Sequence, residues 1–179
     1  MYQKMSKLAV QGGVVWITGL SNAGKTTVAR ALVTLLRSRG GHPIHLDGDD
    51  LRAVFNIQRA YAPGDREALA LTYSRLAAHL AQQGHVVVVS TISLVSAVHR
   101  QNRQTMNPYL DVVLRADDTV RHARDVRGVL RGTDIVGDDQ AAAFPDHPGL
   151  EFDNDGKRTP QELATKVLDK MEEIGINVY

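Results

Sequence analysis

Short apolar runs alternate along the chain with segments in which apolar residues recur at every third or fourth position. The runs are typical of strands buried on both faces of a parallel sheet, and the recurrent spacing is typical of amphipathic helices. This alternation predicts an α/β fold with a mainly parallel central sheet, because parallel strands are joined by right-handed crossovers. The predicted strands are Val14–Ile17, Ile44–Leu46, Val86–Val89, Leu110–Leu114 and Leu150–Phe152, and the predicted helices are Thr26–Arg39, Asp65–Gln83 and Pro160–Glu173.

The stretch 133–148 breaks this pattern. It contains glycine, aspartates and two prolines without sustained apolar periodicity, so we predict a mobile loop there. A basic run leads into it, and this run is either a solvated helix face or a set of cations near a transferred phosphate. Its members are Arg121, Arg124, Arg127 and Arg131. We therefore predict a mobile lid at approximately 125–148.

Composition narrows the class of protein. The 179 residues carry a formal net charge of +1 and no cysteine. Such a small charge does not favour nucleic-acid binding, and the lack of cysteine excludes disulfides and thiolate zinc sites. No apolar run approaches membrane-spanning length, and the first residues do not resemble a secretion signal. We expect a single domain over 1–179 in the cytoplasm, with no nucleic acid and no membrane as partner.

Residues Gly19–Thr26 match the phosphate-binding pattern G-x-x-x-x-G-K-[ST] directly after the first apolar run. The glycines let the backbone curl so that several N–H groups point at one phosphate, at the positive end of the following helix. In this pattern Lys25 reaches the β- and γ-phosphates and Thr26 reaches Mg²⁺. The fold is therefore predicted to be a P-loop NTPase three-layer sandwich. The predicted nucleotide-binding residues are Gly19, Ser21, Asn22, Ala23, Gly24, Lys25, Thr26 and Thr27.

The nucleotide is expected to be ATP. A GTPase would need a base-reading N-K-x-D segment, and the chain contains none. The seven histidines also lack the spacing of zinc ligands, so Mg²⁺ brought with the nucleotide is the metal we expect.

An acidic cluster, 47–50, follows the second predicted strand. Binding loops stand at the carboxyl ends of parallel strands, and phosphoryl transfer needs positioned groups and charge neutralisation. Asp47 and Asp49 can divide these roles, one holding Mg²⁺, directly or through water, and the other accepting a hydroxyl proton. The structural alternative is an Asx turn or a helix cap at Asp49 or Asp50.

Two arginines, Arg52 and Arg66, flank the segment 61–65. A guanidinium group binds carboxylates and phosphates in a bidentate geometry, so the pair could hold an anionic acceptor. The alternative for either residue is simple solvation at the surface.

These motifs together resemble those of adenylyl-sulfate (APS) kinases, and the resemblance covers nearly the whole chain. The combination of the P-loop with Asp-Gly-Asp is far more specific than a P-loop alone. The matching segments are Gly-Leu-Ser-Asn-Ala-Gly-Lys-Thr-Thr at 19–27, Leu-Asp-Gly-Asp-Asp-Leu-Arg at 46–52, Pro-Gly-Asp-Arg at 63–66, Ser-Thr-Ile-Ser at 90–93, Arg-Asp-Val-Arg-Gly at 124–128 and Leu-Glu-Phe-Asp at 150–153.

The resemblance implies transfer of the γ-phosphate of Mg-ATP to the ribose 3′-hydroxyl of a nucleotide that carries an acidic anhydride. It places Asp49 as the base or acceptor-orienting acid, Tyr61 as the aromatic that stacks on the acceptor base, and Arg124 in the nucleotide site. Arg52 and Arg66 would bind the acceptor anion, and Ile92 and Ser93 would line its pocket. The predicted catalytic residues are Asp49, Lys25 and Asp47, and the predicted metal ligands are Thr26 and Asp47.

Three segments depart from the family pattern on the acceptor side. Residues 67–71 lack an asparagine and basic residues, residues 94–96 lack a proline, an aromatic and an arginine, and Ile135 replaces a lid phenylalanine. APS stays the first-named acceptor. The alternative is a cytidine diphosphoramidate, as in relatives from surface-polysaccharide pathways. An ATP-binding regulatory protein without turnover is the alternative from another class, and the oligomeric state stays open, with a homodimer as one expectation.

Overall fold

The computed structural model describes residues 12–57, 63–126, 128–131, 135–137 and 141–177, and its centre is a sheet of five parallel strands in the order β2-β3-β1-β4-β5. Pairing of β1 with both β3 and β4 places the P-loop at the middle of one sheet edge. The parallel sheet confirms the predicted α/β class. The strands are β1 (Gly13–Thr18), β2 (Ile44–Asp47), β3 (Val86–Thr91), β4 (Tyr109–Arg115) and β5 (Leu150–Asp153).

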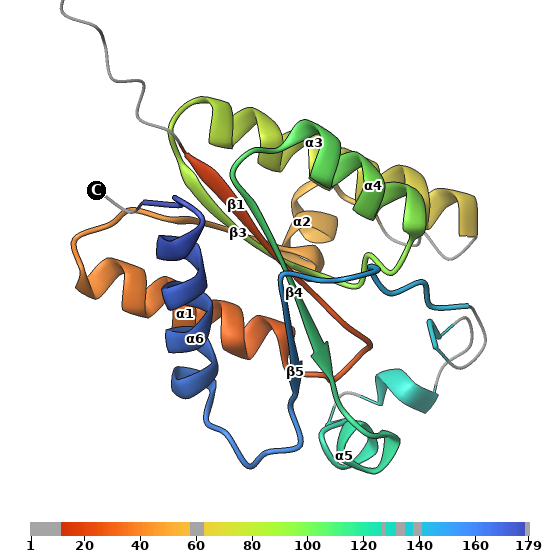
Figure 1. Ribbon diagram of the computed structural model, residues 1–179. Coiled ribbons are helices and arrows are strands. Elements are labelled where there is room, and N and C mark those ends of the chain that lie inside the picture. The colour runs from red at the N-terminus through yellow and green to blue at the C-terminus, as the bar shows by residue number, and fades with distance from the viewer. Residues whose placement is uncertain (1–11, 58–62, 127, 132–134, 138–140, 178–179) are drawn as a thin grey trace, which may run out of the picture.

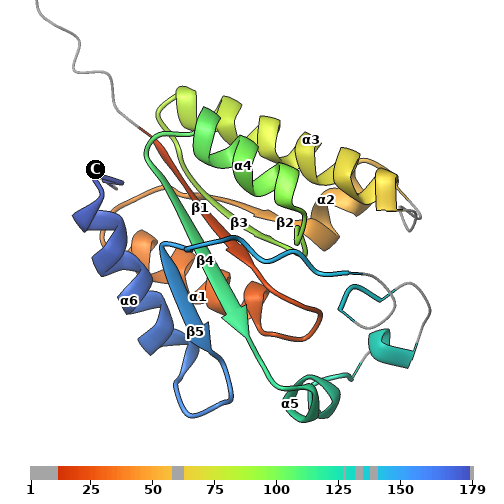
Figure 2. The same ribbon diagram turned by 45° about the vertical axis from the view of Figure 1, so that its right-hand side comes forward.

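Helices cover both faces of the sheet (Figures 1 and 2). Helices α1 (Lys25–Ser38) and α6 (Pro160–Glu173) lie together on one face, and α3 (Pro63–Gln82) and α4 (Ser96–Thr105) lie on the other. This arrangement is the three-layer sandwich expected of a P-loop kinase.

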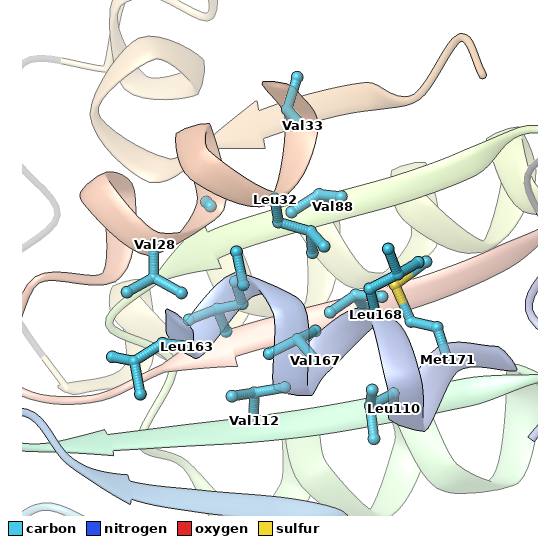
Figure 3. Close-up of a cluster of buried hydrophobic side chains, with 14 of the residues drawn as sticks. Val28, Leu32, Val33, Val88, Leu110, Val112, Leu163, Val167, Leu168 and Met171 are labelled. Atoms are coloured by element: carbon cyan, nitrogen blue, oxygen red, sulfur yellow. The ribbon is translucent and has the colours of Figure 1, made fainter. Parts of the chain in front are cut away.

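The core explains the continuous apolar runs. Along β3, Val86 and Val88 join the cluster under α1 and α6, whereas Val87 and Val89 join the cluster under α3 and α4. Successive side chains of a strand point to opposite faces, so a strand covered on both sides needs apolar residues at every position. Figure 3 shows the first of these clusters, with Val28, Leu32, Val33, Val88, Leu110, Val112, Leu163, Val167, Leu168 and Met171 labelled.

The observed helix ends follow local capping signals. At the start of α6 the Thr159 hydroxyl accepts from the Glu162 N–H, and Glu162 accepts from the Thr159 N–H, with Pro160 in the first turn. This reciprocal capping box satisfies two amide donors that the helix itself leaves unpaired.

Apolar periodicity in the sequence does not predict three of the helices, which are α2 (Gly48–Val54), α4 and α5 (Asp118–Ala123). Helix α2 is a short extension of the acidic loop, and the Asp47 side chain caps it by accepting from the Asp49 N–H at 3.0 Å. The helix cap that the structural alternative placed at Asp49 or Asp50 therefore belongs to Asp47. Helix α4 buries only Val98, His99 and Asn102, so its sequence has no apolar stripe to detect.

The predicted lid is described only in part, because Arg127 and residues 132–134 and 138–140 lie outside the described residues. Val129–Arg131 form a turn of 3₁₀ helix. The segment around Ala143 is attached to the loop after β3 and to α4. The Ala143 N–H donates to the Leu94 carbonyl at 2.9 Å, and the His99 ring lies 3.0 Å from the Ala143 carbonyl. Mobility of the lid stays a prediction.

Candidate active site

The P-loop joins β1 to α1 and is tightly packed at two glycines. A Cβ atom at Gly19 would lie 2.3 Å from the Leu114 carbonyl oxygen, and one at Gly24 would lie 2.4 Å from Asn154 Nδ2. Gly24 also has φ +92°, a left-handed conformation that favours glycine. Asn154 in turn donates to the Ala23 carbonyl at 2.8 Å. The loop is therefore held in shape by β4 and by the segment after β5.

Lys25 is the first residue of α1 and is 9% exposed. Its Nζ donates to the Leu20 carbonyl at 2.7 Å, within the P-loop itself. Burial lowers the pKa of Lys25 from 10.5 to about 8, and the carboxylates of Asp49 and Asp47 partly oppose this effect. A buried ammonium group whose charge is only partly balanced by nearby carboxylates binds a polyphosphate strongly.

Asp47 ends β2 and accepts three hydrogen bonds. Its Oδ2 accepts from the Thr26 hydroxyl at 2.7 Å and from the Ser90 hydroxyl at 2.6 Å, and its Oδ1 accepts from the Asp49 N–H. Burial raises the pKa of Asp47, but these hydrogen bonds outweigh it and leave the pKa below its usual value. Asp47 is therefore an ionised carboxylate fixed beside the Thr26 hydroxyl.

Oxygen ligands of this kind fit Mg²⁺. A hydroxyl and a carboxylate beside a phosphate-binding loop supply hard donors, and Mg²⁺ usually completes its shell with substrate phosphates and water. Among the residues that the structure describes, no group of three or more histidine, aspartate or glutamate side chains could hold a metal by itself. The site thus suits a metal that arrives with a nucleotide.

Asp49 lies in the first turn of α2, two residues beyond Asp47, and forms an ion pair with Arg52 of the same helix. Both side chains are partly exposed. The Asp49 N–H donates to the same Asp47 carboxylate that accepts from Thr26 of the P-loop, and the charge of Asp49 opposes the lowering of the Lys25 pKa by burial. Tyr73 of α3 packs against this turn, with its hydroxyl 3.5 Å from the Gly48 carbonyl.

Of the remaining predicted acceptor residues, the structure describes Arg66, Ile92 and Ser93 but not Tyr61. Arg66 lies in the first part of α3 and is half-buried, whereas Tyr61 lies outside the described residues. Ile92 and Ser93 directly follow β3, beside the P-loop strand. Ser93 is fully buried, and its hydroxyl has no hydrogen-bond partner in the described part of the chain. A buried polar group without a partner requires an explanation, and an ordered water or a bound ligand would provide one.

Arg124 follows α5 and lies near the P-loop. Its Nη1 is 3.8 Å from the position of a Cβ at Gly24, and its Nη2 is 3.7 Å from that of a Cβ at Gly156. The Nη1 atom is buried without a hydrogen-bond partner among the residues described. The prediction that Arg124 belongs to the nucleotide site is compatible with this place between the P-loop and the loop after β5.

The P-loop is also tied to the lid. Asn22, with φ +61°, donates from Nδ2 to Asp125 Oδ1 at 3.0 Å. The Asp125 carboxylate also accepts from the N–H groups of Val129 and Leu130. A rearrangement at Asn22 can therefore be transmitted to the base of the lid. Thr27, by contrast, is exposed in the first turn of α1.

Several residues at the site were not predicted from the sequence. Arg121 was expected in a basic run, but it is 2% exposed and donates from Nε to the Ser21 carbonyl at 3.1 Å. Ser90 and Asn154 fix Asp47 and the P-loop through the contacts given above. These roles depend on strand register and loop packing, and no local sequence pattern carries them.

The chain resembles known kinases in sequence and in fold. Residues 11–139 match the family model described as adenylylsulphate kinase. An adenylyl-sulfate kinase of Rippkaea orientalis is 32% identical over 171 residues, which are 92% of this chain and 94% of that protein. A cytidine diphosphoramidate kinase of Campylobacter jejuni is 34% identical over 116 residues, which are 65% of this chain and 68% of that protein.

A solved structure of the APS kinase of Mycobacterium tuberculosis in complex with AMPPNP and APS is similar with a TM-score of 0.83 and 28% identity, over 90% of this chain and 98% of that chain. Of the helices described here, none is long and apolar enough to cross a membrane. The match of both sequence and fold shows that this chain belongs to the adenylylsulphate kinase family, whose members are phosphotransferases that act on a hydroxyl group.

Proposed function

We propose that the protein transfers the γ-phosphate of Mg-ATP to the ribose 3′-hydroxyl of a small nucleotide conjugate. One observation carries this proposal. Thr26, the residue after Lys25 in the P-loop, donates to Asp47 at 2.7 Å, and the Asp49 N–H donates to the same carboxylate at 3.0 Å, at one edge of the parallel sheet. Phosphoryl transfer depends on positioning and charge neutralisation, and these four side chains supply both.

The donor half of the site is assigned to the P-loop. Its backbone N–H groups and Lys25 would hold the phosphates. The negative phosphates would raise the pKa of the buried Lys25 side chain, so that it would be fully protonated. Thr26 and Asp47 would hold Mg²⁺, directly or through water. Bound Mg²⁺ neutralises charge that develops on the β- and γ-phosphate oxygens. Arg124, whose Nη1 is buried beside Gly24, would contact the ATP nucleotide.

The acceptor half is assigned to Asp49 and its neighbours. Asp49 would accept or orient the proton of the attacking hydroxyl, and Arg52 beside it would leave its ion pair to bind an acceptor anion. Arg66 would bind the same acceptor, and Tyr61 would stack on its base. Ile92 and Ser93 would line the pocket, since the buried Ser93 hydroxyl lacks a partner among the described residues.

APS is the first-named acceptor because both the family model and the M. tuberculosis structure with bound APS point to it. The second candidate is cytidine diphosphoramidate, and the similarity to the C. jejuni kinase favours it. The acceptor-side departures also favour it. Leu69 and Leu71 pack against the core cluster under α3, and Leu94 is 3% exposed, so these positions offer an acceptor no charge or hydrogen bond.

A cytoplasmic location and a homodimer stay predictions that accompany this proposal.

The proposal is tested by separating nucleotide binding from turnover. Asp49→Asn should lower turnover at least about 100-fold, because a positioned acid–base group contributes a factor of that order or more. It should leave Mg-ATP affinity within about twofold. Asp50→Asn, an exposed neighbour in the same helix, is the matched control and should keep both properties.

ADP release with each acceptor and binding of a fluorescent ATP analogue are the two measurements. Normal turnover in Asp49→Asn would contradict the assigned role. A wild-type protein that binds ATP tightly without phosphorylating either acceptor would instead support the regulatory alternative.

A further inference from the structure

A hydrogen-bonded row of side chains, His45 and Ser90, leads to Asp47. His45 Nε2 lies 2.9 Å from Ser90 Oγ, and Ser90 Oγ donates to Asp47 Oδ2 at 2.6 Å. His45 is half-buried, whereas Ser90 is 2% exposed. The row therefore begins at a partly accessible side chain and ends at the carboxylate that is assigned to magnesium.

The strand register builds this row. His45 pairs with Val88 and Asp47 pairs with Ser90 across β2 and β3. Residues two apart in a strand point to the same face, so His45, Asp47 and Ser90 all face α1. Helix α1 supplies the Thr26 hydroxyl to the same Asp47 oxygen from that face.

The directions of the hydrogen bonds follow from the donor inventory. A serine hydroxyl has one hydrogen, and an ionised carboxylate can only accept. The Ser90 hydrogen is therefore used toward Asp47, and Ser90 Oγ must accept the hydrogen of His45 Nε2. Within the described part of the chain, Ser90 Oγ has no other donor.

We propose that His45 is a positioning residue for the magnesium-binding acid. Its Nε2–H holds the Ser90 oxygen so that the Ser90 hydroxyl points at Asp47 Oδ2, and this keeps Oδ2 beside the Thr26 hydroxyl. Without the ring, the Ser90 hydroxyl can rotate to other acceptors, and Asp47 loses one of two restraints on that oxygen. The inference rests on the proposed binding of Mg²⁺ by Thr26 and Asp47.

The effect should appear in the response to magnesium rather than in nucleotide contacts. Groups that orient a metal ligand usually change metal affinity by about 10- to 100-fold, and one neutral hydrogen bond usually contributes a factor of a few. We expect Ser90→Ala to raise the Mg²⁺ concentration for half-maximal binding of a fluorescent ATP analogue about tenfold. His45→Leu should raise it about fivefold, and metal-free binding should not change.

A conservative replacement and a double mutant separate positioning from packing. His45→Gln keeps an N–H donor near the place of Nε2 and should stay within about twofold of the wild type. If His45 acts through Ser90, His45→Leu added to Ser90→Ala should produce no further loss. The kcat at saturating Mg²⁺ should change less than the Mg²⁺ requirement in each single variant.

Two results would overturn the inference. One is an equal Mg²⁺ requirement in His45→Gln and His45→Leu, and the other is a full additional loss from His45→Leu in the Ser90→Ala background. Failure of the proposed function looks different, because the wild-type protein would then phosphorylate neither acceptor. Failure of the proposed magnesium site alone would appear as wild-type binding of the analogue without any dependence on Mg²⁺.

Discussion

Replacement of Lys25 by methionine should stabilise the ligand-free protein and abolish its response to Mg-ATP. Lys25 is buried in the fold, and burial lowers its pKa from 10.5 to about 8. A drop of that size corresponds to about 3 kcal/mol of unfavourable free energy at neutral pH. Methionine has a similar length and no charge, so it removes this penalty.

Part of the gain is lost with the hydrogen bond from Lys25 Nζ to the Leu20 carbonyl. Such a bond from a charged donor contributes about 1.5–3 kcal/mol. The net stabilisation at pH 7 should therefore be about 1 kcal/mol, which corresponds to a rise in Tm of about 2–4 °C for a chain of this size.

The sign of the pH dependence follows from proton linkage. The pKa of Lys25 is lower in the folded protein than in the unfolded chain, so the unfolded state binds more protons between pH 8 and pH 10.5. The contribution of Lys25 to wild-type stability therefore rises with pH across that window. The advantage of Lys25→Met should be complete below pH 8, should disappear within about one pH unit above pH 8, and should become a disadvantage by pH 10.5.

Thermal unfolding of the wild type and Lys25→Met at pH 7 and pH 10, with and without Mg-ATP, is the assay. Lys166→Met replaces an exposed lysine of α6 and should change stability by no more than about 0.5 kcal/mol. A less stable Lys25→Met protein at pH 7, or one that Mg-ATP still stabilises, would refute this explanation of the P-loop.

Three further variants test neighbouring contacts. Gly24→Ala should weaken Mg-ATP binding at least about tenfold, because the new Cβ would lie 2.4 Å from Asn154 Nδ2. Gly40→Ala is the control, since Gly40 also has a positive φ but lies in open space. It should lower stability by about 1 kcal/mol without changing Mg-ATP binding. Arg124→Ala should weaken ATP binding about tenfold in calorimetry, and an unchanged affinity would remove it from the nucleotide site. Asp111→Ala should lower the free energy of unfolding, measured in urea, by about 2–4 kcal/mol. The Asp111 side chain is 5% exposed, forms an ion pair with Arg103 of α4 and accepts a hydrogen bond from the Gly149 N–H before β5. A loss below about 1 kcal/mol would contradict that role.

The strands and the phosphate-binding loop could be predicted from the sequence because their signals are local. The apolar run Val86–Val89 by itself indicates a strand that is covered on both faces of the sheet. At Gly24 the left-handed φ of +92° is likewise a property of the loop itself, although the close contacts of Gly19 and Gly24 with Leu114 and Asn154 depend on the fold. Helix α4 could not be predicted by the same means, because it packs through single residues such as Asn102 rather than through an apolar stripe.

The site was predictable only in outline. Asp47 and Asp49 were recognised as an acidic pair at a strand end, but the capping of α2 by Asp47 requires the backbone direction after β2. The contact of His45 with Ser90 depends on the register of two strands that are more than 40 positions apart in sequence. Burial of Arg121 against the P-loop similarly depends on tertiary packing.

Phosphorylation of a nucleotide conjugate is tested most directly by the mass of the product formed from Mg-ATP with APS and, separately, with cytidine diphosphoramidate. We predict ADP release together with one added phosphate on the ribose of one of these acceptors, and loss of that product in Asp49→Asn. Absence of a phosphorylated product with both acceptors, in a protein that still binds Mg-ATP, would contradict this prediction.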